Sequence, residues 1–83
     1  MPTVHRIGST KIDVYFNDHL PPHFHVICGN DRALVEIRTL AIYSGYVPPK
    51  SLKAVLDWAA GDGIQEKLMD FFIKCNPRHS QET

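Results

Sequence analysis

The chain has 83 residues, 43% of them apolar, and its nine basic and nine acidic side chains cancel at neutral pH. This length allows one domain, and the apolar content is typical of a folded protein rather than a disordered one. The balanced charge gives no support to a strongly electrostatic binder of nucleic acid or membranes, although it leaves room for a local basic patch.

The N-terminal residues, Met1 to Arg6, contain no apolar stretch typical of a signal peptide. No apolar run in the chain approaches the ~20 residues that cross a bilayer. We therefore predict a cytoplasmic protein that does not enter a membrane. In that compartment Cys28 and Cys75 stay reduced, and a small buried thiol is favoured over a disulfide for each of them.

The first half of the chain has apolar residues at every second position, which is typical of strands. Strands are predicted at residues 4–7, 11–16, 23–28, 32–38 and 40–43. In the second of these, Ile12 and Val14 share the face that turns to the core. Pro21-Pro22 belongs to a loop, and Ser44-Gly45 is predicted to end the last strand. The connections are too short for parallel crossovers, so the strands are antiparallel neighbours.

The second half changes to the period of a helix. Apolar residues share one helical face at Leu52, Val55, Leu56 and Ala59. Pro48-Pro49 fits the first turn of this helix and Gly61 ends it. Asp62 is predicted to cap a second helix, with Gln65 three residues later, and Asn76-Pro77 ends that helix.

These patterns predict an α+β fold. We expect an antiparallel sheet of four to five strands, followed by two C-terminal helices packed on one face. Residues 1–76 form the single domain, and residues 77–83 are predicted to be a flexible C-terminal tail.

Ionisable side chains are concentrated in one short segment of the chain. Asp18, His19, His23 and His25 fall within eight residues. On a strand, His23 and His25 leave the same face with their Cα atoms ~6–7 Å apart, while Phe24 points the opposite way into the core. A rigid loop beside a strand is a common way to preorganise a site, so this segment is the candidate functional site.

Imidazoles in such a cluster suit several kinds of chemistry. His19, His23 and His25 could bind zinc or another divalent transition metal, although the sequence favours no cofactor. His23 and His25 could instead act as a catalytic acid and base, or hydrogen-bond a phosphate. Asp18, His19 and Arg6 are then candidate binding residues. The structural alternative is that the histidines only order the loop and bond its carbonyls.

Aromatic residues outside this segment have weaker claims to a functional role. Trp58 lies beside the apolar face of the first helix, where packing is favoured over a binding role. Tyr43 and Tyr46 flank Gly45, and they form either an exposed aromatic patch or a packing contact at the entry to the helix.

Three stretches of the chain resemble the bacterial domain-of-unknown-function 4160 family. These are Met1 to Val4, the block Tyr15-Phe16-Asn17-Asp18-His19-x-Pro21-Pro22-His23-Phe24-His25-Val26, and Pro48-Pro49 leading into Leu52-x-x-Val55-Leu56-x-Trp58. The resemblance extends to about Phe72. Members are small bacterial proteins, often encoded beside a second small protein in an arrangement like a toxin–antitoxin pair. The resemblance implies a protein partner and an RNA or DNA target, but no established activity or catalytic residue.

The leading functional hypothesis is a component of a toxin–antitoxin-like module that acts through a protein partner and RNA. One alternative is a small histidine- or metal-dependent hydrolase, similar to a ribonuclease, and another is a purely structural interaction domain. The sequence leaves open whether the protein is an enzyme and which oligomeric state it adopts. If a site exists, it should lie on the sheet face that the helices leave open. Replacing His23 and His25 there should then cost little stability.

Overall fold

The computed structural model describes residues 3–14 and 21–76. Five strands form one sheet in the order β1-β2-β3-β4-β5, and every neighbouring pair is antiparallel. The elements in chain order are β1 Thr3–Ile7, β2 Thr10–Asp13, β3 His23–Cys28, β4 Asp31–Glu36, β5 Ile42–Tyr46, α1 Pro49–Ala59 and α2 Ile64–Cys75. This arrangement confirms the predicted α+β fold with two C-terminal helices. The predicted tail, residues 77–83, lies outside the described residues.

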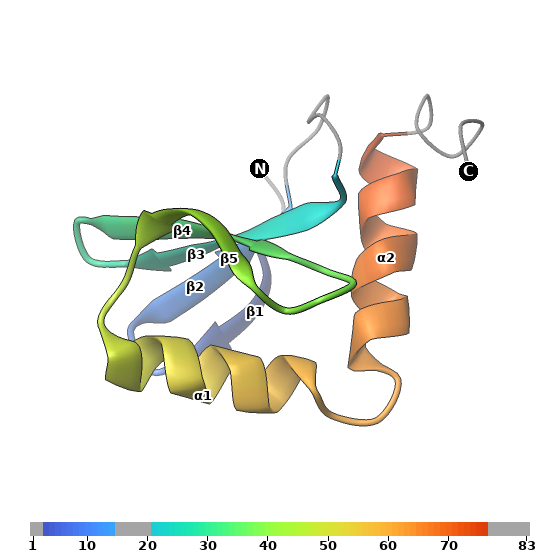
Figure 1. The fold of residues 1–83 in the computed structure, drawn as a ribbon. Helices are drawn as coiled ribbons and strands as arrows, with labels where there is room; N and C mark the ends of the chain where they lie inside the picture. The colour runs from blue at the N-terminus through green and yellow to red at the C-terminus, as the bar shows by residue number, and fades with distance from the viewer. Residues whose placement is uncertain (1–2, 15–20, 77–83) are drawn as a thin grey trace.

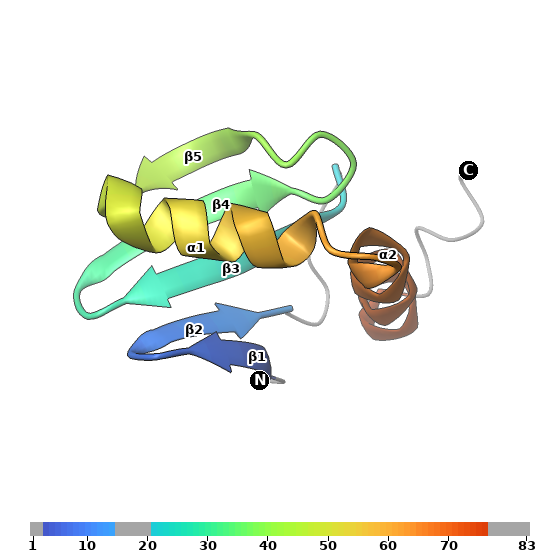
Figure 2. The ribbon, with the colours of Figure 1, turned by 90° about the horizontal axis from the view of Figure 1, so that it is seen from below.

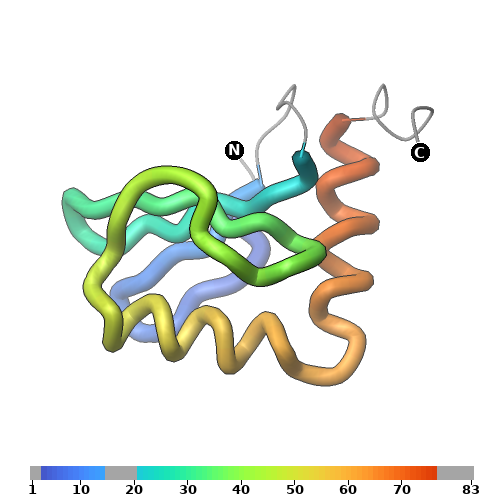
Figure 3. Tube along the Cα trace, viewed as in Figure 1, coloured from blue at the N-terminus to red at the C-terminus, as the bar shows by residue number. Residues whose placement is uncertain are grey.

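The two helices contact the sheet in different ways. Figure 1 shows α1 running along one face of the sheet, while α2 stands across the end of the sheet. Seen from below, α1 lies over β3 and β4, and α2 is viewed along its axis beyond the strands (Figure 2). The chain trace in Figure 3 shows the turn between the helices that sends α2 in this new direction. α1 therefore covers only one of the two faces of the sheet.

The core lies between the sheet and α1 and continues to α2. Strand residues of one face are buried together with Val55 and Ala59 of α1 and with Leu68 and Phe72 of α2. The buried residues on this face are Ile12, Phe24, Val26, Ala33 and Val35 of the strands, together with Val14 directly after β2. They recur at every second position because successive strand side chains point to opposite faces. The predicted inward orientation of Ile12, Val14 and Phe24 is confirmed.

The prediction for the last strand was wrong in its position. Leu40 was predicted to begin this strand, but its backbone is left-handed at φ 58° and its N–H donates to Glu36 O at 2.8 Å. Leu40 therefore closes the turn after β4. Its apolar side chain packs against the core, which explains why a turn residue looked like part of a strand. Ser44 and Gly45, predicted to end the strand, lie within β5.

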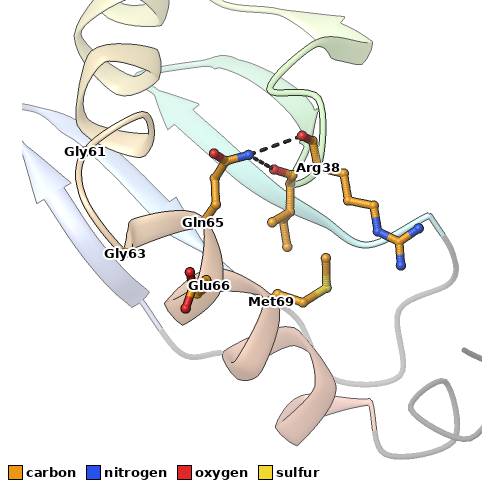
Figure 4. A pocket seen from close by; sticks show the side chains of 7 residues that line it. Arg38, Gly61, Gly63, Gln65, Glu66 and Met69 are labelled. Carbon is orange, nitrogen blue, oxygen red and sulfur yellow. Dashed lines mark hydrogen bonds between the residues drawn. The ribbon is translucent and has the colours of Figure 1, made fainter.

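The start of α2 also differs from its predicted form. The residue before the helix is Gly63 in a left-handed conformation, and no side-chain cap hydrogen bond is formed there. Asp62 was therefore wrongly predicted to cap the helix. Gln65 instead donates from Nε2 to Ile37 O at 2.8 Å and to Arg38 O at 3.2 Å (Figure 4). These bonds attach the first turn of α2 to the chain that follows β4.

Cys28 is the last residue of β3, and Cys75 is the last residue of α2. Cys28 is partly buried, with its Sγ 3.4 Å from Ser51 Oγ of α1, and Cys75 is buried near the end of α2. Both are free thiols, as predicted. Burial raises the pKa of the Cys75 thiol, which keeps it protonated at neutral pH. Neither helix in the described part of the chain is long and apolar enough to span a membrane.

Candidate functional site

The Pro21-Pro22-His23 segment is held by hydrogen bonds to both proline carbonyls. His23 Nδ1 lies 2.7 Å from Pro21 O, and Ile37 N–H donates to Pro22 O at 3.0 Å. A carbonyl oxygen only accepts, so His23 carries a proton on Nδ1 and donates it. Proline has no backbone N–H that could donate to a neighbouring strand, but its carbonyl oxygen still accepts a hydrogen bond. The segment thus enters β3 in one orientation, and His23 helps to set that orientation.

His23 was predicted to project into solvent, and this expectation was wrong. Only 1% of the residue is exposed. Its ring centroid lies 5.9 Å from that of Phe72 in α2 and 5.4 Å from that of Tyr43 in β5. α2 stands across the end of the sheet where β3 begins (Figure 1), so it covers a side chain that strand alternation alone would place in the open. This burial gives His23 a structural role in packing the sheet against α2.

His25 keeps the position that the sequence predicted for it. It is partly exposed, and its ring centroid is 5.2 Å from that of His23. Its cross-strand neighbours are Asp13 of β2 and Leu34 of β4. These residues point to the face opposite α1, because their chain neighbours on each strand belong to the core. His25 is therefore the histidine of the pair that a ligand on this face would reach.

Asp13 is the residue of this region that the sequence pattern missed. It is 1% exposed, and its Oδ2 lies 3.5 Å from Nζ of Lys11, whose side chain is 36% exposed. Within the described residues, the buried Oδ1 of Asp13 has no hydrogen-bond partner. An incompletely satisfied buried carboxylate is costly and is often found at functional sites. The alternation of the strand placed Asp13 beside Lys11, but only the pairing of β2 with β3 brings it beside His25.

The remaining predicted site residues are not gathered with the histidine pair. Asp18 and His19 lie outside the described residues, so their predicted orienting and binding roles stay predictions. Arg6 is exposed on β1, two strands away from His25, and pairs across the strands with Lys11. Arg6 therefore belongs to a different part of the open face, next to Lys11 rather than to the histidines.

The residues meet only part of what a zinc site requires. The bond from His23 Nδ1 to a carbonyl resembles the contact that orients metal-binding imidazoles. However, residues 3–14 and 21–76 contain no group of three or more His, Cys, Asp or Glu side chains placed to hold a metal ion. Of the predicted ligands, His23 and His25 are two of the three that a catalytic zinc site needs, and the third is His19.

We expect zinc to leave the melting temperature of the untagged protein unchanged, because His23 is buried among aromatic rings. Binding with a dissociation constant a hundredfold below the free zinc concentration would instead stabilise the protein by ~2.7 kcal/mol. Thermal denaturation with and without zinc, together with metal analysis of the purified protein, tests this. A stabilisation that disappears in His25→Ala would reinstate the predicted zinc site.

Two pockets in the described part of the chain have linings that do not include His23 or His25. One, of about 410 Å³, is bordered by Arg38, Gln65, Glu66 and Met69, at the contact between α2 and the chain after β4 (Figure 4). The other, of about 310 Å³, lies between the start of β1, Trp58 and α2. Trp58 also stacks on His5 of β1, with ring centroids 4.4 Å apart, which confirms that it packs against the sheet. Neither pocket brings a histidine or a thiol to its lining.

The model of a protein family, described as domain of unknown function (DUF4160), matches residues 10–70. The chain belongs to the DUF4160 family. No curated protein and no solved structure matches the chain significantly. The DUF4160 match begins with β2 and ends within α2, so it includes His23, His25, Asp13 and the whole of β5. Arg6 of β1 and Phe72 of α2 lie outside the matched residues.

Proposed function

We propose that this DUF4160 protein is a cytoplasmic component of a toxin–antitoxin-like module and acts by binding a small protein partner. In this proposal the partner adds an extended strand to the outer edge of β5. The observation that carries it is the location of the exposed apolar side chains. Ile42, Tyr43 and Tyr46, the large hydrophobic residues exposed in the described part of the chain, all belong to β5.

The edge of β5 is suited to pairing with another strand. β5 is the last strand of the sheet, so one row of its N–H and C=O groups faces away from β4. Figure 2 shows this strand at the sheet margin, away from α2. Added strands gain main-chain hydrogen bonds from such an edge and specificity from its side chains. The exposed fractions of 39% for Tyr43 and 59% for Tyr46 leave apolar surface for a partner to bury.

The two edges of the sheet differ in charge. Residues 39–49, which include β5, contain no charged side chain, whereas β1 at the opposite edge carries Arg6. Charged side chains are a common device that keeps edge strands from pairing with other chains. A register shift between Leu34 and Val35 twists the start of β5, so pairing is expected from Ser44 onward rather than along the entire strand. The unprotected edge is therefore that of β5.

Co-expression with the protein encoded by the adjacent gene, followed by size-exclusion chromatography, tests the proposal. We expect the two proteins to elute together. Tyr46→Lys places a charge on the uncharged edge and should weaken the complex at least tenfold, because the ammonium must be desolvated or displaced from the interface. Thr3→Lys is the matched control, since it adds the same charge to the exposed start of β1. Loss of the complex in both variants, or in neither, would contradict binding at β5.

A second candidate, a histidine-dependent hydrolase acting on RNA, is supported by the buried carboxylate of Asp13 beside His25. In this alternative His25 is the general base and Asp13 supplies negative charge next to it. A ribonuclease assay of the purified protein, compared with His25→Ala, separates the two functions. Cleavage that is lost in His25→Ala while the complex with the partner persists would favour the hydrolase. The absence of cleavage in the unmodified protein would leave partner binding as the function.

A further inference from the structure

The open face of the sheet carries one row of side chains that crosses all five strands. Strand pairing aligns Arg6 with Lys11, Lys11 with Ile27, Ile27 with Arg32, and Arg32 with Tyr46. We name this set the cross-sheet row. Its members point away from α1, because the residues that precede or follow them, such as Ile12, Val26 and Ala33, are buried in the core. The row contains three basic residues, one aromatic residue and no acidic residue.

The cations of this row are available to a ligand. Arg6 and Arg32 are exposed, and within the described residues neither forms an ion pair. Lys11 is partly engaged by Asp13, with 3.5 Å between Nζ and Oδ2. Tyr46 ends the row with 59% of its surface exposed. The overall charge of zero therefore hides a local positive stripe, because the acidic residues of the strands, Asp13, Asp31 and Glu36, lie outside the row.

The dimensions of the row fit a flexible polyanion with stacking groups. Strands lie ~4.8 Å apart, so five strands give a row ~19 Å long. Proteins that bind single-stranded nucleic acid combine cations along the backbone with aromatic rings that stack bases, each stack contributing roughly 1–3 kcal/mol. Arg32 lies between the other cations and Tyr46, where its guanidinium could contact a phosphate or stack on a base.

We propose that the cross-sheet row binds single-stranded nucleic acid, with Arg6, Lys11 and Arg32 on the phosphates and Tyr46 stacked on a base. This inference names the target of the proposed module, and it depends mainly on residues outside the edge of β5. Few phosphates are contacted, so affinity is expected in the range of about 1–100 µM at moderate salt, typical of non-specific binding. An acidic peptide is the competing ligand that the same cations could accept.

Fluorescence anisotropy with labelled oligouridine and labelled oligothymidine at low salt tests the proposal. We expect both to bind the unmodified protein. Arg6→Gln with Arg32→Gln should weaken binding at least tenfold and reduce the dependence of the logarithm of affinity on the logarithm of salt by ~1.4, since each phosphate contact contributes ~0.7 for single strands. The control, Lys50→Gln with Lys53→Gln, removes the same charge from α1, on the covered face, and should bind normally.

The stacking step has its own test. Tyr46→Ala should weaken oligouridine binding about tenfold, while Tyr46→Phe should retain it, because phenylalanine keeps the aromatic face. Failure of both oligonucleotides to bind would overturn the proposal, as would equal losses in the row variant and the α1 control. Tighter binding of a polyglutamate peptide than of either oligonucleotide would assign the row to an acidic protein segment. Co-elution of the partner with the Arg6→Gln, Arg32→Gln variant shows whether partner binding is independent.

Discussion

Replacement of Gly45 by alanine is expected to lower the free energy of unfolding by about 3 kcal/mol. Gly45 has φ +81°, and a Cβ at this position would lie 2.3 Å from Arg32 O and 3.0 Å from the Cα of Ala33. Both contacts are with the backbone of the neighbouring strand, which cannot rotate away as a side chain can. The substitution therefore forces β5 away from β4 and adds the strain of a left-handed residue.

Gly29→Ala is the matched control. Gly29 also has positive φ, at +59°, but a Cβ there would meet nothing within 4 Å. Its replacement should cost only the conformational strain, about 1 kcal/mol. Urea denaturation of both variants measures the difference, and the slope with denaturant shows whether unfolding remains two-state. Equal losses at the two positions would mean that β4 and β5 do not approach as closely as the structure has them.

His23→Ala is expected to lower the free energy of unfolding by about 2–4 kcal/mol. The substitution removes a buried ring from contact with Phe72 and Tyr43 and leaves Pro21 O without its donor. His23→Asn should recover part of the loss, because its amide N–H lies near the position of Nδ1 and can still donate to that carbonyl. His23→Gln places its amide near the position of Nε2 and should recover less. Equilibrium denaturation in urea measures all three variants.

His25→Ala provides the comparison on the same strand. His25 is partly exposed, so its loss should cost about 0.5 kcal/mol or less. If His23→Ala were equally mild while partner binding or RNA cleavage disappeared, His23 would act chemically and its structural role would be refuted. The opposite pattern, a large loss of stability with unchanged binding per folded molecule, would show that the role of His23 is structural.

The order and type of the elements followed from local patterns. Apolar alternation located β3 at residues 23–28 with the same limits as in the structure, and the helical period located both helices. These signals are strong because each element buries one face, and burial repeats along the chain with the period of the element. The errors lie where an apolar residue serves a turn, as at Leu40, or where a polar residue finds a distant partner, as at Gln65.

The candidate site was predicted less completely than the fold. The sequence identified His23 and His25 and placed them on one face of a strand, since that follows from a period of two. It did not indicate that α2 buries His23, because the direction of α2 depends on the turn after α1 and on the bonds from Gln65 to the chain after β4. Asp13 joined the site only through the register of β2 with β3.

The sequence by itself thus determined the elements, their core faces, the histidine-rich segment and the family to which the chain belongs. Tertiary structure decided which of the two histidines is exposed, which sheet edge carries the apolar side chains, and which cations align in the cross-sheet row. The physical reason is the distance along the chain over which each kind of signal acts. Periodicity reports how a segment meets its immediate surroundings, whereas strand register and helix direction depend on contacts between residues far apart in the chain, and these leave no local pattern.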